Sequence, residues 1–289
     1  MCKKPVEDIL FNNQKITFIG PGVMAEAMIS GLIREGLARP EALYASGPSQ
    51  ERVDQLSQKY GIHGLTDNVA AVHQADVVVL SVKPQQLDKV LAGLHASIQP
   101  SALVLSIVAG APIEKIAEVL AHSSVVRSMP NTPAQIGEGI TVWTAVPSVS
   151  AEQKEMARQI LCALGDEIFV EEETYLDYAT ALSGTGPAYV FLFMEAMVDA
   201  GVHLGFPRRI AEQLVAKTVR GSVDYYWGME DPMHLARLRN QVTSPGGTTA
   251  YALYYLEKAG FRTAISRAIW AAYERSCELG KEGKSHVPD

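Results

Sequence analysis

The chain has 289 residues, a formal net charge of −7 and a mean hydropathy of +0.05. The length suggests two domains, and the mild acidity argues against a nucleic-acid groove or a basic membrane surface, both of which need clustered lysine and arginine. The three cysteines, Cys2, Cys162 and Cys277, lie far apart and form no C-x-x-C pair. We therefore expect inert thiols, no disulfide framework, no metal site and a reducing, cytoplasmic location.

Residues 1–14 have no long apolar run behind a basic end and are too acidic for a typical transit peptide, so we interpret them as a loose extension. No later apolar stretch approaches the ~20 residues of a membrane span, and we expect no membrane partner. The tail from Gly280 to Asp289 is polar, and we expect it to fray.

Short β-branched runs alternate with helical patterns up to about Val170. The run Val77–Val82 is continuously apolar, as expected of a strand that is covered on both faces. Such alternation predicts βαβ units and a mostly parallel sheet. The other predicted strands are Lys15–Gly20, Ala42–Ser46, Leu103–Val108, Val125–Ser128, Ile140–Thr144 and Ile168–Val170, and the predicted helices begin at Met24, Gln50 and Pro112.

From Tyr175 the pattern is almost entirely helical, with glycine-rich breaks at Ser183–Pro187 and Ser244–Gly247. We place the domain boundary near Glu171–Glu173, which gives domains 15–170 and 171–289. The predicted helices are Ala188–Leu204, Arg208–Trp227, Pro232–Asn240, Thr248–Lys258 and Phe261–Leu279.

The helix over Phe191–Val198 is apolar nearly all round, so it is expected to be buried on several sides. A helical domain of about 115 residues buries little surface on its own. We therefore expect a homodimer that shares these helices, with a compact monomeric bundle as the alternative.

A glycine-rich motif, Gly20-Pro21-Gly22-Val23-Met24-Ala25, follows the first predicted strand and opens the first predicted helix. It reads G-x-G-x-x-A, a variant of the dinucleotide-binding fingerprint. Gly20 makes the tight turn, Gly22 lets a pyrophosphate approach the backbone, and Ala25 allows close packing of helix and strand. In this context the motif predicts a Rossmann-type dinucleotide-binding domain, and a plain strand–helix turn is the alternative.

The end of the second strand, Ala45-Ser46-Gly47, lacks the acidic residue that usually binds the ribose of NAD. Ser46, Ser49 and Arg52 lie there or just beyond and could bind a 2′-phosphate instead. We therefore favour NADP(H), with a solvated Arg52 as the alternative.

Later strand ends should line the same crevice, because ligands gather at the carboxyl ends of such sheets. Asn131 supplies an amide suited to nicotinamide or ribose, and Asn68 lies in a similar position after the third strand. Lys83 would face the cofactor phosphates or the substrate, unless it is simply a surface lysine.

The densest cluster of hydroxyl groups and glycines in the helical half is Thr243–Thr249, which leads directly into a helix. Such a helix start suits a carboxylate, although an ordinary capping loop is the alternative. The two glycines in Ser183–Pro187 suggest close approach of a backbone or a ligand, since glycine inside a helix costs roughly 1 kcal/mol.

The sequence has no H-E-x-x-H motif and no metal-spaced cluster, and its seven histidines are scattered. Alcohol oxidation normally needs a base such as histidine or lysine. Reduction of a protonated C=N bond needs only orientation over the nicotinamide, a carboxylate anchor and a hydrogen bond to nitrogen. The residues therefore favour imine reduction.

Five motifs, in order between about residues 15 and 280, carry a resemblance to one family. They are Phe18–Ala25, Ser81–Pro84, Met129–Pro133, Ala181–Tyr189 and Val242–Thr249. The chain resembles pyrroline-5-carboxylate reductase, although Thr185 stands where the family commonly has serine and Pro21 replaces a more usual small residue.

The resemblance implies an α/β Rossmann-type N-terminal domain, an all-α C-terminal dimerisation domain, and reduction of 1-pyrroline-5-carboxylate to L-proline with NADPH or NADH. It also implies an active site completed across a dimer, and dimers of this family often associate further into decamers. By likeness, the loop from Ser244 would hold the substrate carboxylate through Gly246, Gly247 and Thr248, and Thr249 would sit at the ring nitrogen. Glu173 matches an acidic position near the substrate.

The same likeness extends to the cofactor contacts. These are Gly20, Pro21, Gly22, Val23, Met24, Ala25, Ser46, Asn68, Ser81, Val82, Lys83, Pro84, Ile107, Val108 and Ala109.

Two alternatives remain from the residues. One is a β-hydroxyacid dehydrogenase, which would use a lysine on the long helix after the dinucleotide-binding domain, yet Tyr189–Leu204 has none and Lys217 lies one helix later. The other is a nucleotide-binding module without catalysis, against which the intact Ser244–Thr249 loop argues.

Overall fold

The computed structural model describes residues 11, 14–229 and 233–282. They form two compact units. The first consists of the residues up to Thr185 together with those from Ala272 onward, and the second is Gly186–Ala271.

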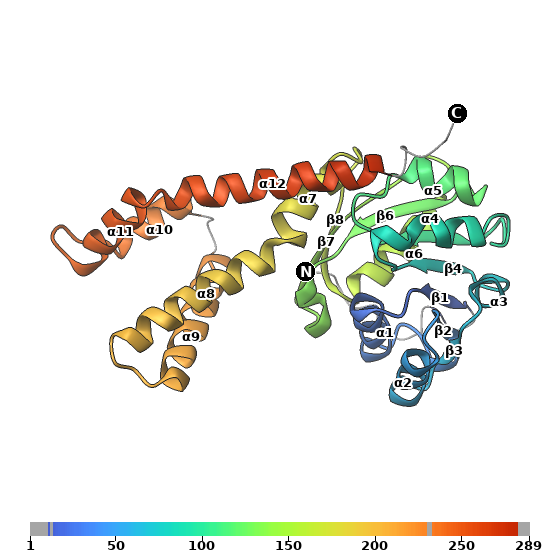
Figure 1. The fold of residues 1–289 in the computed structure, drawn as a ribbon, viewed down its shortest axis with the longest axis horizontal. Helices are drawn as coiled ribbons and strands as arrows, with labels where there is room; N and C mark the ends of the chain where they lie inside the picture. Colours follow the sequence, from blue (N-terminus) through green and yellow to red (C-terminus); the bar gives the residue numbers. More distant parts are fainter. Residues whose placement is uncertain (1–10, 12–13, 230–232, 283–289) are drawn as a thin grey trace. The chain divides into compact units, whose positions relative to one another are not determined.

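The first unit is built on one sheet with the strand order β3-β2-β1-β4-β5-β6-β7-β8 (Figure 1). Neighbouring strands run parallel except β6 and β7, which are antiparallel. The mostly parallel sheet is therefore confirmed. Its strands are β1 (Ile16–Ile19), β2 (Leu43–Ser46), β3 (His63–Leu65), β4 (Val77–Leu80), β5 (Leu103–Ser106), β6 (Val125–Met129), β7 (Gly139–Ala145) and β8 (Gly165–Phe169).

Helices cover both faces of this sheet. Val77 and Val79 pack in a core with α1 and α6, whereas Val78 and Leu80 pack in a second core with α3, α4 and α5. This two-sided burial explains the continuous apolar run. The helices of this unit are α1 (Val23–Arg34), α2 (Gln50–Tyr60), α3 (Asn68–Val72), α4 (Pro84–Gly93), α5 (Ile113–Leu120), α6 (Ala151–Cys162) and α7 (Tyr175–Ala179).

Some elements of this unit escaped the sequence patterns. Strand β3 has three residues, two of them exposed, and therefore carries almost no apolar signal. Helix α6 is polar on its outer side and is marked instead by a capping box between Ser150 and Gln153. The short helix α3 begins at an Asp67 cap.

Three expectations about the ends of the chain and the cysteines need correction. Phe11, expected in the loose extension, is fully buried, while the rest of residues 1–13 lie outside the described part. Gly280 is part of a helix packed on Gly110, so fraying does not begin there. Cys162 forms a disulfide bond, contrary to the expectation of inert thiols, whereas Cys277 keeps a free thiol.

The described residues of the second unit form helices joined by loops and contain no strand, as predicted. Its elements are α8 (Gly186–His203), α9 (Arg208–Trp227), α10 (Leu235–Gln241), α11 (Thr248–Lys258) and most of α12 (Phe261–Glu282).

The predicted break at Ser183–Pro187 is found as a π-helical turn at Thr180–Gly184 and a bend at Thr185, after which α8 begins at Gly186. Taken as one helical segment of 29 residues, Tyr175–His203 contains an 18-residue window with a mean hydropathy of 1.2, and it is long and apolar enough to cross a membrane, by length and composition only. The expectation that no apolar stretch approaches the length of a membrane span is wrong. Small and hydroxyl-bearing residues interrupt the apolar run, so the sequence pattern did not reveal this segment.

Helices α1 and α2 are joined through one carboxylate. Glu26 accepts hydrogen bonds from Arg52 Nη2 at 2.5 Å, Lys59 Nζ at 2.8 Å and Tyr60 Oη at 2.9 Å. These donors outweigh the effect of burial and lower the pKa of Glu26 to about 2. The ionised form is therefore favoured in the folded protein.

This network predicts a pH-dependent contribution to stability. Because the folded pKa of Glu26 lies below its ordinary value of 4.5, the contribution is full above about pH 5 and is lost as the pH falls toward 2. The Glu26→Gln variant should be less stable than the wild type at pH 7, and the difference should shrink progressively below pH 4.5. Urea unfolding of both proteins at pH 7, 4 and 3, at one protein concentration, checks this. A difference that is independent of pH would contradict it.

Candidate functional site

The carboxyl ends of β1 and β4 meet where the strand order reverses, since the chain visits β2 and β3 between them. A Cβ on Gly20 would lie 2.7 Å from Val82 Cγ1 and 2.9 Å from Ser81 O. Ser81 Oγ donates toward Ile19 O and Gly20 O, at 3.0 and 2.9 Å. The structure thus brings together two of the predicted cofactor segments, at the position where open α/β sheets bind ligands.

The glycine-rich loop makes a turn centred on Pro21. Gly20 has φ +98°, and Gly22 N donates to Gly20 O at 2.8 Å. This i→i+2 bond is the pattern of a γ-turn, and the φ of proline near −65° suits its inverse form. The proline therefore fits the turn.

The loop presents an open anion cradle. A Cβ on Gly22 would meet nothing closer than Ser81 O at 4.0 Å. Helix α1 starts at Val23 with no side-chain cap, so its first N–H groups are left to a ligand, and Val23 itself is 62% exposed. Uncapped N–H groups beside an open glycine fit a pyrophosphate.

The side chains expected at a 2′-phosphate have partners within the protein. Ser46 is buried and donates to Asn68 Oδ1 at 2.7 Å. Ser49 Oγ accepts from Arg52 N at 3.3 Å and so caps α2. Arg52 donates from Nε to Pro21 O at 2.8 Å. None of these contacts was apparent from the sequence.

The remaining predicted strand ends also border this edge of the sheet. Lys83 is exposed and precedes α4, and Pro84 occupies the first helical position. Val108 is buried just after β5, with Ile107 and Ala109 half-buried beside it.

Asn131 is nine-tenths buried, and its Oδ1 accepts from Ile140 N at 3.0 Å. This bond ties the end of β6 to the start of β7 and engages the amide oxygen. A contact of the amide nitrogen with nicotinamide or ribose stays a prediction.

The neighbour of Gly184 is a side chain rather than the expected backbone or ligand, and a Cβ on Gly186 would meet nothing within 4 Å. A Cβ on Gly184 would lie 2.6 Å from Met129 Cε at the end of β6. The nearby hydroxyls of Thr180, Ser183 and Thr185 donate to carbonyls within the same helix, at 2.7, 3.0 and 2.8 Å. They occupy carbonyl groups around the π-helical turn. Turns of this kind are frequent at functional sites.

Glu173 lies in an ion network that the sequence did not reveal. Its Oε1 accepts from Arg127 Nη1 at 2.8 Å and from Ile113 N at 2.9 Å. Arg127 is 4% exposed and also donates to Asp177 Oδ1 at 2.9 Å, which Ser276 Oγ reaches at the same distance. Removing either carboxylate would leave the buried charge of the arginine without one of its partners, which is strongly unfavourable. This network joins β6 to α7 and to the end of α12, and a contact of Glu173 with substrate stays a prediction.

The predicted substrate loop lies in the second unit. Gly246 has φ +70°, and a Cβ on Gly247 would lie 2.4 Å from Ser244 Oγ. Helix α11 then begins at Thr248 with no side-chain cap, with Thr248 exposed and Thr249 half-buried. The loop is thus a tight turn that leads into free helix N–H groups, as an anion site requires.

No group of three or more His, Cys, Asp or Glu residues that could hold a metal occurs among the residues that the structure describes. Lys217, which the dehydrogenase alternative needs in a site, is exposed on α9.

Comparison with known proteins decides the family. The pyrroline-5-carboxylate reductase of a Synechocystis strain is 42% identical over 268 residues, 93% of this chain and 99% of that protein. The chain belongs to the pyrroline-5-carboxylate reductase family. Residues 173–279 match the model for pyrroline-5-carboxylate reductase dimerisation, and residues 15–110 match the model for NADP oxidoreductase, coenzyme F420-dependent.

Two solved structures from the pyrroline-5-carboxylate reductase family confirm the fold. The Plasmodium falciparum protein with NADP bound has a TM-score of 0.84 at 33% identity and covers 93% of this chain and 98% of its own. The Coxiella burnetii protein has a TM-score of 0.83 at 38% identity, with 93% and 100% covered. The Rossmann-type domain joined to a dimerisation domain is therefore the fold of this chain, and family membership removes the dehydrogenase alternative.

The network around Arg127 generates a stability prediction. Glu173→Gln keeps the shape of the side chain but replaces an ionic hydrogen bond to Arg127 with a neutral one. We expect a loss of about 1–3 kcal/mol in the free energy of unfolding. Denaturant unfolding measures it, with Glu172→Gln as the control, because Glu172 is exposed next to it. Equal stabilities of the two variants would show that the network contributes nothing.

Proposed function

We propose that this chain reduces 1-pyrroline-5-carboxylate to L-proline, the last step of proline biosynthesis, with NADPH as cofactor. The observation that carries the substrate assignment is the uncapped start of α11 behind the Gly246-Gly247 turn. It offers backbone N–H groups to one carboxylate, and the substrate has one. Family membership over nearly the whole chain supports the rest.

At the substrate, Gly246, Gly247 and Thr248 hold the carboxylate through their backbone, with Ser244 shaping the turn. Thr249 forms a hydrogen bond with the ring nitrogen. NADPH supplies the hydride for the carbon of the C=N bond, while the nitrogen keeps its proton and becomes the amine of proline. The protonated imine already attracts hydride. The side chains therefore need only hold the substrate ring in the one orientation that places its C=N carbon at the nicotinamide.

At the cofactor, the uncapped start of α1 and the open face of Gly22 receive the pyrophosphate. The family model for the N-terminal half and the NADP in the Plasmodium relative support NADPH as the cofactor. The other residues that we place at the cofactor are Gly20, Pro21, Val23, Met24, Ala25, Ser46, Ser49, Asn68, Ser81, Val82, Lys83, Pro84, Ile107, Val108, Ala109 and Asn131. Arg52 borders this site through the Pro21 carbonyl.

Initial rates of NADPH and NADH oxidation, measured in parallel with 1-pyrroline-5-carboxylate at matched concentrations, test this function. We expect turnover with both cofactors and a preference for NADPH. Binding of NADPH without any turnover would leave the fold intact but overturn the substrate assignment, as the binding-module alternative requires.

The hydroxyl of Thr249 has a sharper test. Thr249→Val removes the hydrogen bond to the ring nitrogen and should lower kcat by about 10²-fold, a typical loss for one donor in a reacting site, without weakening NADPH binding. Thr243→Val is the matched control, since the hydroxyl of Thr243 donates to Arg239 O at 2.7 Å in the same loop. An unchanged kcat in Thr249→Val, or an equal loss in the control, would remove Thr249 from the mechanism. A rise in the KM for pyrroline-5-carboxylate in Glu173→Gln would place Glu173 at the substrate as well.

The working unit is a homodimer formed by the C-terminal helices. The buried apolar core within the second unit comprises Val198, Ala211 and Val215. By contrast, Phe191 and Leu192 on α8 are 64% and 67% exposed. Monomeric proteins rarely leave so much apolar surface to water. Cover by a second copy explains the apolar α8 surface without a membrane.

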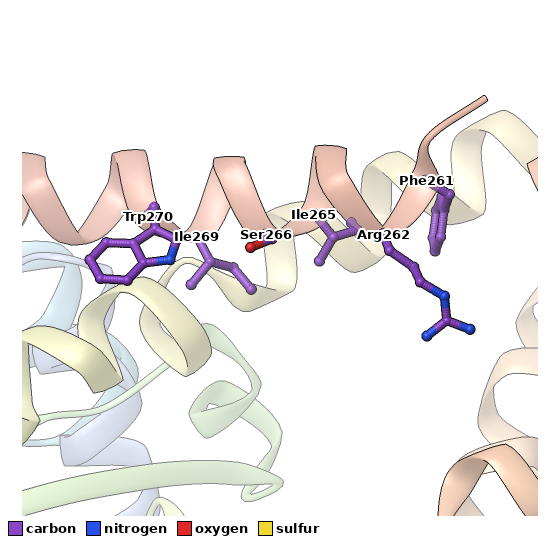
Figure 2. Close-up of a pocket in the computed structure, with 6 residues that line it drawn as sticks. All are labelled: Phe261, Arg262, Ile265, Ser266, Ile269 and Trp270. Carbon is purple, nitrogen blue, oxygen red and sulfur yellow. The ribbon is translucent and has the colours of Figure 1, made fainter. Parts of the chain in front are cut away.

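Helix α12 also exposes apolar side chains to solvent. Figure 2 shows Phe261, Ile265 and Ile269 following one another along the helix, with Trp270 beside them. Together with Arg262 and Ser266 they line a shallow pocket of about 400 Å³ that is almost wholly apolar. A groove of this kind fits the helices of a partner chain.

Charge on this surface should therefore dissociate the dimer. Phe191→Asp should at least halve the mass measured by multi-angle light scattering and lower activity with it, since an unpaired carboxylate in an apolar interface is strongly unfavourable. Lys89→Asp introduces the same charge on the exposed side of α4 and should leave the mass unchanged. The wild-type mass also distinguishes a dimer from a decamer. A monomeric wild type would contradict the proposal.

A further inference from the structure

The structure offers a role for Arg52 that differs from contact with a 2′-phosphate. Arg52, the third residue of α2, donates two hydrogen bonds through its planar guanidinium. Nε donates to Pro21 O at 2.8 Å, and Nη2 donates to Glu26 at 2.5 Å. A guanidinium bound at two of its nitrogens is fixed in both position and orientation. Arg52 therefore holds the glycine-rich loop from helix α2.

Pro21 is immobilised from two directions. Its carbonyl is held by Arg52, and its ring packs on Gly47, where a Cβ would lie 2.4 Å from Pro21 Cδ. Pro21 is also the residue across which Gly22 N reaches Gly20 O. Any movement of its carbonyl would rotate the peptide that leads into Gly22 and the first N–H groups of α1.

Glu26 completes the arrangement. It lies in the first turn of α1, where a negative charge is favourable, and it is shared by Arg52 and Lys59. What Glu26 fixes is therefore the orientation of the Arg52 guanidinium, whose Nε and Nη2 are both engaged within the protein. The lowered pKa of Glu26 keeps this carboxylate charged at every pH at which the enzyme is expected to work.

We propose that Glu26 and Arg52 form a clamp that positions the Pro21 carbonyl, and through it the pyrophosphate-binding turn, for NADPH and NADH alike. Both are positioning residues, and Glu26 acts only through Arg52. The inference rests on the proposed cofactor site at Gly20–Ala25. It assigns the discrimination between NADPH and NADH to groups other than the Arg52 side chain.

Titration of the purified protein with NADPH and with NADH, without substrate, measures both dissociation constants directly. Arg52→Ala should raise both by the same factor, about tenfold, the scale of one hydrogen bond to a charged group. An effect on NADPH alone would overturn the clamp and return Arg52 to the 2′-phosphate, and no effect on either would overturn it as well.

A double-mutant cycle tests the connection through Glu26. Glu26→Gln should weaken both cofactors in the wild-type background and have no further effect in Arg52→Ala. Lys59→Ala is the control, because it removes the other ion pair of Glu26 but leaves Arg52 on Pro21. If Lys59→Ala weakened binding as much as Arg52→Ala, a general loosening of α1 and α2 would replace the clamp.

If Arg52→Ala does not fold, Glu26→Gln alone carries the test, and unchanged affinities in that variant overturn the clamp.

Two further outcomes separate this inference from the function it rests on. If wild-type protein binds neither cofactor, the cofactor site and the clamp fall together. Binding without turnover of pyrroline-5-carboxylate would overturn the substrate assignment only.

Discussion

The absence of a side chain at Gly20 is the constraint on which the nucleotide end of the molecule depends. A Cβ there would fall inside van der Waals distance of Ser81 and Val82, so the ends of β1 and β4 could not close on each other. Their closure creates the point where the strand order reverses, and a crevice opens there because successive connections leave the sheet on opposite sides. The positive φ of the same residue turns the chain so that the start of α1 faces that crevice.

Charge then holds this geometry in place at two separate positions of the first unit. Glu26 ties α2 to α1 beside the glycine-rich loop, and Arg127 ties β6 to α7 through Glu173 and Asp177. The Arg127 network is the more deeply buried, so loss of one partner there leaves a charge with poor access to water. The Glu26 network is nearer the surface, where ion pairs contribute less to stability. Its value therefore lies more in where it places Arg52 than in free energy of folding.

Much of the fold could be predicted from the sequence, for reasons that individual residues make plain. Buried strands such as Val77–Leu80 are apolar on both faces, and α9 and α11 have the predicted bounds because proline and glycine mark where they start. The glycine motif and the Ser244–Thr249 loop are local in sequence, so their geometry could be anticipated. The partners of Ser46, Arg52, Asn131 and Glu173 could not, since each is 9 to 60 residues distant along the chain. Polar pairing of this kind leaves no periodicity.

The second unit differs from the first, because α8 exposes large apolar side chains to solvent. A helix with Phe191 and Leu192 exposed beside a small three-residue core is stable only if another surface removes those side chains from water. Residues 173–279, which include this helix, match the model for pyrroline-5-carboxylate reductase dimerisation. The apolar side chains of α8 are therefore best explained as a surface that the chain keeps for a partner rather than for its own core.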